Sequence, residues 1–194
     1  MRSVLFGSGV LLAALALVGC SQQSAEVGDT EGFVAGDGSS VILPVDQRKP
    51  APVLTGTDLN GEQVDTSTWQ GSPGVINVWA SWCAPCRAEA PELVAVSKKN
   101  PDVNFLGLDT RDSDASARAF VKKFGITYPN LPDPNGQLVL QFSDSLPPQA
   151  IPSTLLIDGE GRVAGRFLGA VDAGELDTAL QDLAAETAGS GASP

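Results

Sequence analysis

Short apolar runs alternate with helical patterns along the middle of the chain. Buried strands are predicted where branched and aromatic apolar residues follow one another closely, at 74–80, 102–109 and 153–158. Helices are predicted where apolar residues recur at helical spacing, at 85–98, 114–124 and from Asp172 to about Ala185. Strands that alternate with helices indicate an α/β domain.

Turn residues refine this pattern at both ends of the domain. Asn60-Gly61 lies between apolar positions at 52–54 and 62–64 and predicts an N-terminal β-hairpin. Gly159-Glu160-Gly161 joins the strand at 153–158 to a further run at 162–168. These last two strands should be antiparallel neighbours, so we expect a central mixed sheet flanked by helices.

The two ends of the chain lack this patterning. Residues 20–47 are rich in Ser, Gln, Gly, Asp and Glu, and residues 187–194 in Ala, Gly and Ser. Such segments bury too little apolar surface to offset the entropy lost on ordering. We therefore predict a flexible tether over 20–47, with room for a short strand at Val41-Ile42-Leu43, a folded domain over 48–186 and a disordered tail over 187–194.

The first residues are predicted to be a targeting segment. Arg2 precedes an uncharged apolar run from Val4 to Val18, which suits a signal peptide better than a membrane span. Leu17-Val18-Gly19-Cys20 resembles a bacterial lipobox, which implies that residues 1–19 are a lipoprotein signal peptide and that Cys20 carries diacylglycerol. An ordinary signal peptide and an uncleaved anchor remain alternatives. All three place the domain outside the cytoplasm, where disulfides persist.

Charge and composition exclude several function classes. The formal net charge of −11 argues against nucleic acid as a partner, because phosphates would be repelled. The absence of histidine excludes Ser–His and Cys–His catalytic pairs. The carboxylates of Asp109, Asp112 and Asp114 lack the glycine and terminal glutamate of a calcium loop, so helix capping and solvation explain them better.

Cys83 and Cys86 are the candidate chemical groups. Structural zinc needs four ligands, but the chain adds only the distant Cys20, and c-type haem needs a histidine where Arg87 stands. A structural disulfide across two residues would stabilise little by chain entropy. A redox pair fits better, because the N-terminus of the helix at 85–98 favours a thiolate on Cys83, and Cys86 is close enough to resolve a mixed disulfide.

The sequence around these thiols resembles a known family. VWASWCAPC at 78–86 is similar to the active-site strand and turn of the thioredoxin superfamily, and RAEAP at 87–91 to its TlpA/ResA/DsbE-like branch. IPST at 151–154 extends the resemblance, which runs from about Ala51 to Ala185. It implies a thioredoxin-like fold and a membrane-tethered extracytoplasmic thiol–disulfide oxidoreductase.

The resemblance also implies roles for residues around the cysteines. Pro152 should be a cis-proline opposite the thiols, with Ile151 offering its backbone to an extended substrate and Trp82 forming a wall of the groove. Thioredoxins have a buried aspartate where this chain has Asn77, which cannot take a proton. Glu89 is the expected replacement, as a partly buried carboxyl that exchanges a proton with Cys86.

The expected function is therefore disulfide exchange with protein substrates, in a reductase role that prepares the thiols of apocytochrome c for haem. A membrane thiol carrier would supply electrons, and no cofactor or metal beyond the redox-active Cys83–Cys86 disulfide is expected. The protein should be a lipid-anchored monomer. A disulfide-forming oxidase and a non-catalytic thiol or copper-binding module remain alternatives. A peroxide-reducing site would need a Thr-x-x-Cys motif, which the chain lacks.

Overall fold

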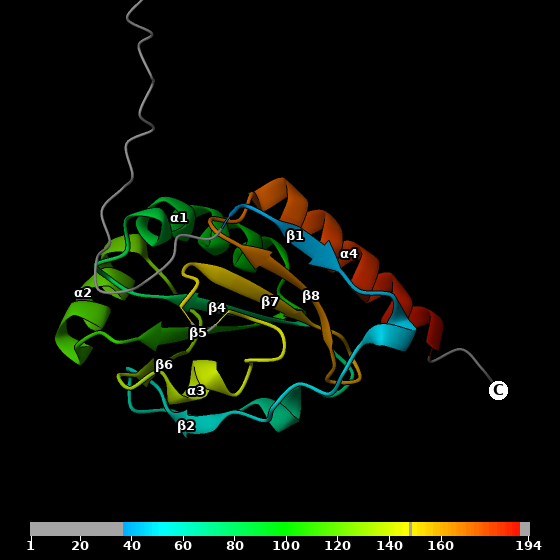
Figure 1. The fold of residues 1–194 in the computed structure, drawn as a ribbon, viewed down its shortest axis with the longest axis horizontal. Coiled ribbons are helices and arrows are strands. Elements are labelled where there is room, and N and C mark those ends of the chain that lie inside the picture. Colours follow the sequence, from blue (N-terminus) through cyan, green and yellow to red (C-terminus); the bar gives the residue numbers. More distant parts are fainter. Residues whose placement is uncertain (1–36, 148, 191–194) are drawn as a thin grey trace, which may run out of the picture.

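The computed structural model describes residues 37–147 and 149–190. Within them, a central sheet has the strand order β1-β8-β7-β4-β5-β6 (Figure 1). Its strands are β1 (Ser40–Ile42), β4 (Gly74–Trp79), β5 (Asn104–Thr110), β6 (Asn130–Asp133), β7 (Ser153–Ile157) and β8 (Val163–Leu168). Strands β4, β5 and β6 are parallel, whereas β7 pairs antiparallel with β4, β8 with β7 and β1 with β8. The predicted mixed sheet is confirmed.

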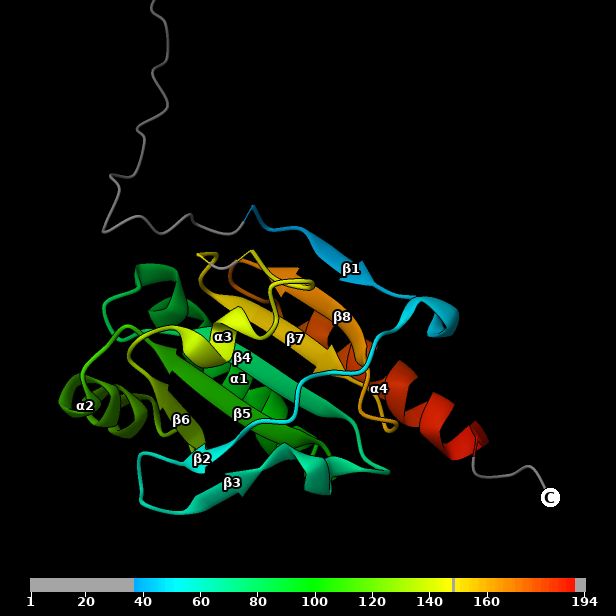
Figure 2. The ribbon, with the colours of Figure 1, turned by 60° about the horizontal axis from the view of Figure 1, so that its bottom comes forward.

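Helices and a hairpin cover the two faces of this sheet. Figures 1 and 2 show α1 (Ala84–Lys99) and α4 (Ala173–Ser190) on one face, with α2 (Asp114–Phe124) near β6. The opposite face carries α3 (Gln137–Leu140) and the hairpin of β2 (Thr55–Thr57) and β3 (Gln63–Asp65). The predicted hairpin is therefore present, although its first strand begins three residues later than the run at 52–54.

The period-two alternation of the strands decides which face each side chain serves. Val75 of β4, Phe105 of β5 and Leu156 of β7 belong to the apolar cluster built with α1 and α4. Ile76 and Leu106, one residue further along their strands, belong to the larger second cluster. Both faces of β4 and β5 are thus buried, and the turn after β4 starts from a strand that packing holds in place.

The N-terminal boundary of the domain lies earlier than predicted, and the short strand expected at 41–43 is present as β1, at Ser40–Ile42. In the described part of the predicted tether, β1 pairs with β8 and a 3₁₀ helix, η1, spans Val45–Gln47. This pairing covers the outer edge of β8, whose backbone groups would otherwise lack strand partners. The predicted signal peptide at 1–19 and lipid attachment at Cys20 lie outside the described residues and stay predictions.

The C-terminal boundary also differs, because α4 continues to Ser190 and so includes the first residues of the predicted tail at 187–194. No helix in the described ranges is long and apolar enough to cross a lipid bilayer.

Strand β6 was not predicted. It has a single fully apolar side chain, Leu131, and contains Pro132, which weakens any strand pattern. Pairing with β5, from Gly107 opposite Asn130 to Thr110 opposite Asp133, makes it the last strand of the sheet. An edge strand tolerates proline because one side of its backbone needs no partner.

Candidate active site

The two cysteines lie where strand β4 leads into helix α1. Cys83 and Cys86 form a disulfide, with an S–S distance of 2.05 Å. Cys83 is the N-cap of α1, and its sulfur accepts a hydrogen bond from the backbone N–H of Cys86 at 3.2 Å. Pro85 occupies the first turn, where the missing N–H costs no helical hydrogen bond. After reduction, the amides and dipole at this helix end would favour negative charge on the Cys83 sulfur.

Glu89 is buried beneath this turn. Its side chain is 2% exposed, and its two oxygens accept hydrogen bonds from the Asn77 amide at 2.9 Å and from the Val171 backbone N–H at 3.1 Å. Burial raises the pKa of Glu89 to about 7, although both hydrogen bonds favour the ionised form and oppose the shift. The carboxyl can therefore take up or release a proton near neutral pH.

Asn77 is hydrogen-bonded to Glu89 and lines a pocket together with the resolving cysteine. Its amide also donates to the Thr154 hydroxyl at 3.1 Å, because β4 and β7 pair Asn77 with Thr154. Asn77, Cys86 and Tyr128 line the same buried pocket. Desolvation, followed by the charge of Glu89, raises the pKa of Tyr128, which keeps its hydroxyl neutral. The roles of Thr154 and Val171 have no signal in the sequence, because they come from strand pairing and from the approach of the segment before α4.

Pro152 lies at the start of β7, beside the end of β4. The Ile151–Pro152 peptide bond is cis, as the resemblance implied. Ser153 pairs with Val78, which brings this segment next to the strand that leads to the cysteines. Both Ile151 and Pro152 are buried, and the Pro152 carbonyl accepts the Gly169 N–H at 2.9 Å. The presentation of the Ile151 backbone to a substrate stays a prediction.

The turn before Cys83 is tied to the loop after β5. The Ser81 N–H donates to the Asp112 carboxylate at 2.7 Å, and the Trp82 indole donates to the Arg111 carbonyl at 3.2 Å. The Arg87 guanidinium donates to the Ser81 carbonyl at 3.0 Å. Trp82 is half-buried, so it packs against the protein and still has surface for a substrate.

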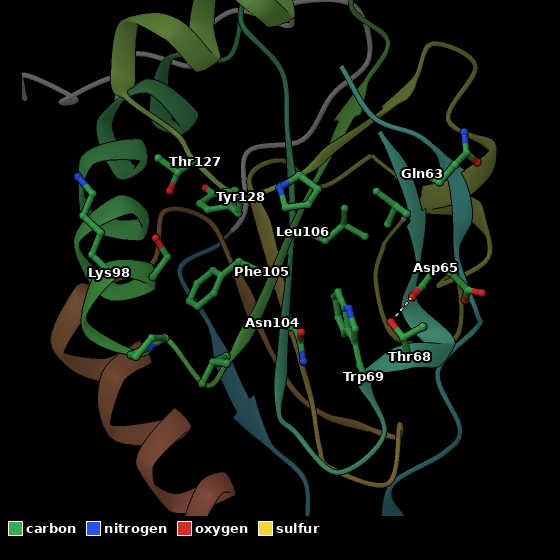
Figure 3. Close-up of a pocket in the computed structure, with 15 residues that line it drawn as sticks. Gln63, Asp65, Thr68, Trp69, Lys98, Asn104, Phe105, Leu106, Thr127 and Tyr128 are labelled. Carbon is green, nitrogen blue, oxygen red and sulfur yellow. Dashed lines mark hydrogen bonds between the residues drawn. The ribbon is translucent and has the colours of Figure 1, made fainter. Parts of the chain in front are cut away.

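A sizeable cavity lies away from the cysteines. It measures about 390 Å³ and is lined by residues of β3, the 3₁₀ helix η2 (Thr66–Trp69), the end of α1 and the start of β5. Figure 3 shows Trp69, Phe105 and Tyr128 among its walls, and neither cysteine belongs to it. In the described part of the chain, no group of three or more Cys, Asp or Glu side chains is arranged to hold a metal ion.

Comparison with known proteins agrees with this geometry. Residues 44–183 match the Redoxin family. The chain is 30% identical over 143 residues to the thiol:disulfide interchange protein HelX of Rhodobacter capsulatus, a match that covers 72% of this chain and 78% of HelX. It is also 37% identical over 90 residues to the soluble secreted antigen MPT53 of Mycobacterium tuberculosis, but this match covers 46% of the chain and about half of MPT53 (52%).

Among solved structures, a DsbF homologue from Corynebacterium diphtheriae superimposes with a TM-score of 0.70 at 30% sequence identity. The superposition covers 76% of this chain and 95% of that protein. The thioredoxin-like fold expected from the sequence is thereby confirmed.

Proposed function

The chain belongs to the Redoxin family, and from that premise we propose that it is a protein thiol–disulfide oxidoreductase whose reacting group is the Cys83–Cys86 pair. The observation that supports this most directly is the disulfide at the N-terminus of α1, with a buried Glu89 carboxyl hydrogen-bonded to Asn77, which lines a pocket together with Cys86. A disulfide that only stapled the fold would need no proton acceptor beneath it.

In the reductase direction, the Cys83 thiolate attacks one sulfur of a substrate disulfide. A mixed disulfide forms, and the other substrate sulfur leaves as a thiolate that takes a proton from water. Cys86 then gives its proton to the Glu89 carboxylate and attacks Cys83. This step closes the Cys83–Cys86 disulfide and releases the second substrate thiol, so the substrate gains the two electrons that the protein loses.

We further propose that the domain acts outside the cytoplasm, tethered to the membrane by lipid on Cys20, as a monomer. Its substrate would be apocytochrome c, and a membrane thiol carrier would return electrons to the oxidised pair. The lipobox-like residues 17–20 and the resemblance to the TlpA/ResA/DsbE-like branch support this finer assignment.

Insulin reduction by dithiothreitol tests the chemistry. The wild type should accelerate the reaction. With Cys83→Ser the rate of insulin reduction should be that of dithiothreitol alone, because Cys83 supplies the attacking sulfur. Equal rates for the two proteins would instead favour a non-catalytic thiol or copper-binding module.

Trapping with Cys86→Ala tests the direction of exchange, because without the resolving thiol the mixed disulfide at Cys83 persists. Apocytochromes among the captured chains would support the reductase role. Capture of many newly exported proteins would support a disulfide-forming oxidase. Radiolabelled palmitate incorporated into the wild type, but not into Cys20→Ala, would support the lipid anchor.

A further inference from the structure

Asp109 is a buried carboxyl that the chemistry above does not use. It lies near the end of β5, opposite Trp79 of β4 and Pro132 of β6, and is 1% exposed. Neither of its side-chain oxygens has a hydrogen-bond partner. The sequence-based interpretation of Asp109 as a capping or solvated residue is therefore wrong. An ionised carboxylate in this position would be costly, because it would lack both water and donors.

The charged groups around Asp109 make its ionised form still less favourable. Burial, and then the negative charges of Asp112 in the loop after β5, Asp114 of α2 and Asp133 of β6, raise the pKa of Asp109 to about 8. The neighbouring strand β4 presents the uncharged Trp79.

Two cations in the adjacent elements bond other groups. Arg118 of α2 pairs with Asp114 and donates to the Leu59 carbonyl, and Arg87 of α1 donates to Ser81. Arg111, in the loop after β5, is exposed, and its guanidinium lies beside Gly136. A β-carbon added to Gly136 would be 3.6 Å from the Arg111 Nε. A neutral Asp109 is therefore the form that this environment accepts at pH 7.

Asp112, the charged neighbour with the largest effect on Asp109, holds the turn that carries the reactive disulfide. One Asp112 oxygen accepts the Ser81 N–H and the other accepts the Ser113 N–H, both at 2.7 Å. A carboxylate offers no donor to a second carboxylate, so the approach of Asp109 to Asp112 is favourable only while one of them is protonated. Both Asp112 oxygens already accept a backbone N–H, whereas neither Asp109 oxygen has a partner, so a proton between the two carboxyls is better placed on Asp109.

We propose that Asp109 is a positioning residue for the disulfide site: in its neutral form it supports Asp112 as the clamp of the Ser81–Trp82 turn, and ionisation of Asp109 loosens that turn. The inference deepens the proposed function and rests on it. The proton passes to solvent, and the resulting pair of carboxylates repel each other. Because Ser81 and Trp82 directly precede Cys83, the looser turn exposes the disulfide.

The oxidised protein allows this proposal to be tested separately from activity, because disulfide-bonded cysteines do not titrate. Tryptophan fluorescence and the rate of disulfide reduction by a water-soluble phosphine would be followed from pH 6 to 9.5. The wild type should change in both near pH 8, with reduction faster by about twofold or more above the transition. Asp109→Asn, which mimics the neutral acid, should behave at every pH as the wild type does at pH 6. Asp109→Ala should resemble the alkaline wild type at every pH.

Two controls separate Asp109 from other carboxyls. Asp102→Asn removes an exposed aspartate and should retain the transition, and so should Glu89→Gln, which removes the other carboxyl that titrates near neutral pH. Superimposable profiles for the wild type and Asp109→Asn would overturn the proposal. So would an Asp109→Asn protein that resembles the alkaline wild type at pH 6.

A direct titration covers the case in which the variants fold poorly. Wild-type protein labelled with ¹³C only at the aspartate carboxyls reports Asp109 and leaves Glu89 silent. One aspartate signal with a midpoint near pH 8 would support the proposal, and the absence of any aspartate titration above pH 6 would overturn it. Neither result depends on insulin reduction, so a failure of this inference is distinguishable from a failure of the proposed oxidoreductase activity.

Discussion

The environment of a single carboxyl decides what chemistry is available at the disulfide site. A glutamate in water has a pKa of 4.5, but Glu89 is buried away from water. It keeps two hydrogen bonds that favour its charged form. The balance leaves its pKa near neutrality. Asn77 cannot take up a proton itself. Its side-chain nitrogen donates to a Glu89 oxygen at 2.9 Å and so fixes the position of the carboxyl.

Glu89→Gln should therefore change how stability depends on pH. Because the pKa of Glu89 is raised from 4.5 to about 7 in the folded state, its contribution to stability is fully present below pH 4.5 and is lost as the pH rises through 7. In the variant this loss, at most about 1.4 kcal/mol per pH unit, should be absent. Urea unfolding of both oxidised proteins at pH 4.5, 6 and 7.5 measures the difference. A constant gap between them would contradict the assignment.

Glu89→Gln should also slow insulin reduction by about tenfold or more, because Cys86 would lose its proton acceptor. The neutral-pH inflection of the wild-type rate profile should disappear with it. A variant that keeps the wild-type rate and profile would show that Glu89 is only a packed residue.

At the scale of elements, close contact between β5 and its neighbours fixes the position of the strand that leads to the cysteines. The Trp79 indole crosses over Gly107 and donates to the Asn130 side-chain oxygen at 3.0 Å. It also stacks on Phe120 of α2, with ring centroids 4.3 Å apart. Gly107 is required because a side chain there would occupy the space of this hydrogen bond.

Gly107→Ala should be strongly destabilising. Its β-carbon would lie 1.9 Å from the Asn130 oxygen and 2.6 Å from the Trp79 nitrogen, and neither side chain can withdraw without losing the other. We expect a loss of about 2–3 kcal/mol in the free energy of unfolding, measured by urea denaturation.

Gly189→Ala is the matched control, because that helical position has open space around it. It should be neutral or stabilising by less than about 1 kcal/mol. Comparable losses in the two variants would refute the packing explanation.

At the scale of the whole molecule, Arg48 joins the N-terminal segment to the C-terminal helix. It is buried and donates to the Leu43 carbonyl at 3.0 Å, to Asp158 at 3.3 Å and to Glu186 at 2.6 Å. The hydrogen bond to Glu186 contributes most to raising the pKa of Arg48, so the guanidinium stays charged. Chain segments separated by more than a hundred residues are therefore held at one point.

Arg48→Ala should lower the free energy of unfolding by about 3 kcal/mol, because a buried carboxylate, Asp158, would lose one of its cationic partners. Arg162 still pairs with Asp158, which limits the loss. Thermal unfolding measured by circular dichroism at pH 7 tests this expectation.

The adjacent Lys49→Ala provides the comparison. Lys49 pairs with Asp144 at 3.7 Å, but both side chains are largely exposed, at 77% and 80%. The change should cost less than about 0.5 kcal/mol. If Lys49→Ala were as destabilising as Arg48→Ala, burial of the ion pair would not be the cause.

The sequence by itself determined the elements whose signals are local. Strands β4, β5, β7 and β8 follow from their apolar runs, and α2 from Ser113 as N-cap and Gly125 as its left-handed C-cap. The position of Cys83 at a helix start and the two-residue spacing to Cys86 were equally local. These features depend on backbone geometry and near neighbours, which are encoded within a few residues.

Tertiary structure alone decided β6, the pairing of β1 with β8 and the partners of the buried carboxyls. Both strands are short and exist because an uncovered neighbouring strand supplies their hydrogen bonds. Glu89 and Asp109 are ordinary acidic residues in the sequence, yet their proton affinity depends on lost water and on groups such as Asn77, Val171 and Asp112. Desolvation is a property of the assembled molecule, so no local pattern can reveal it.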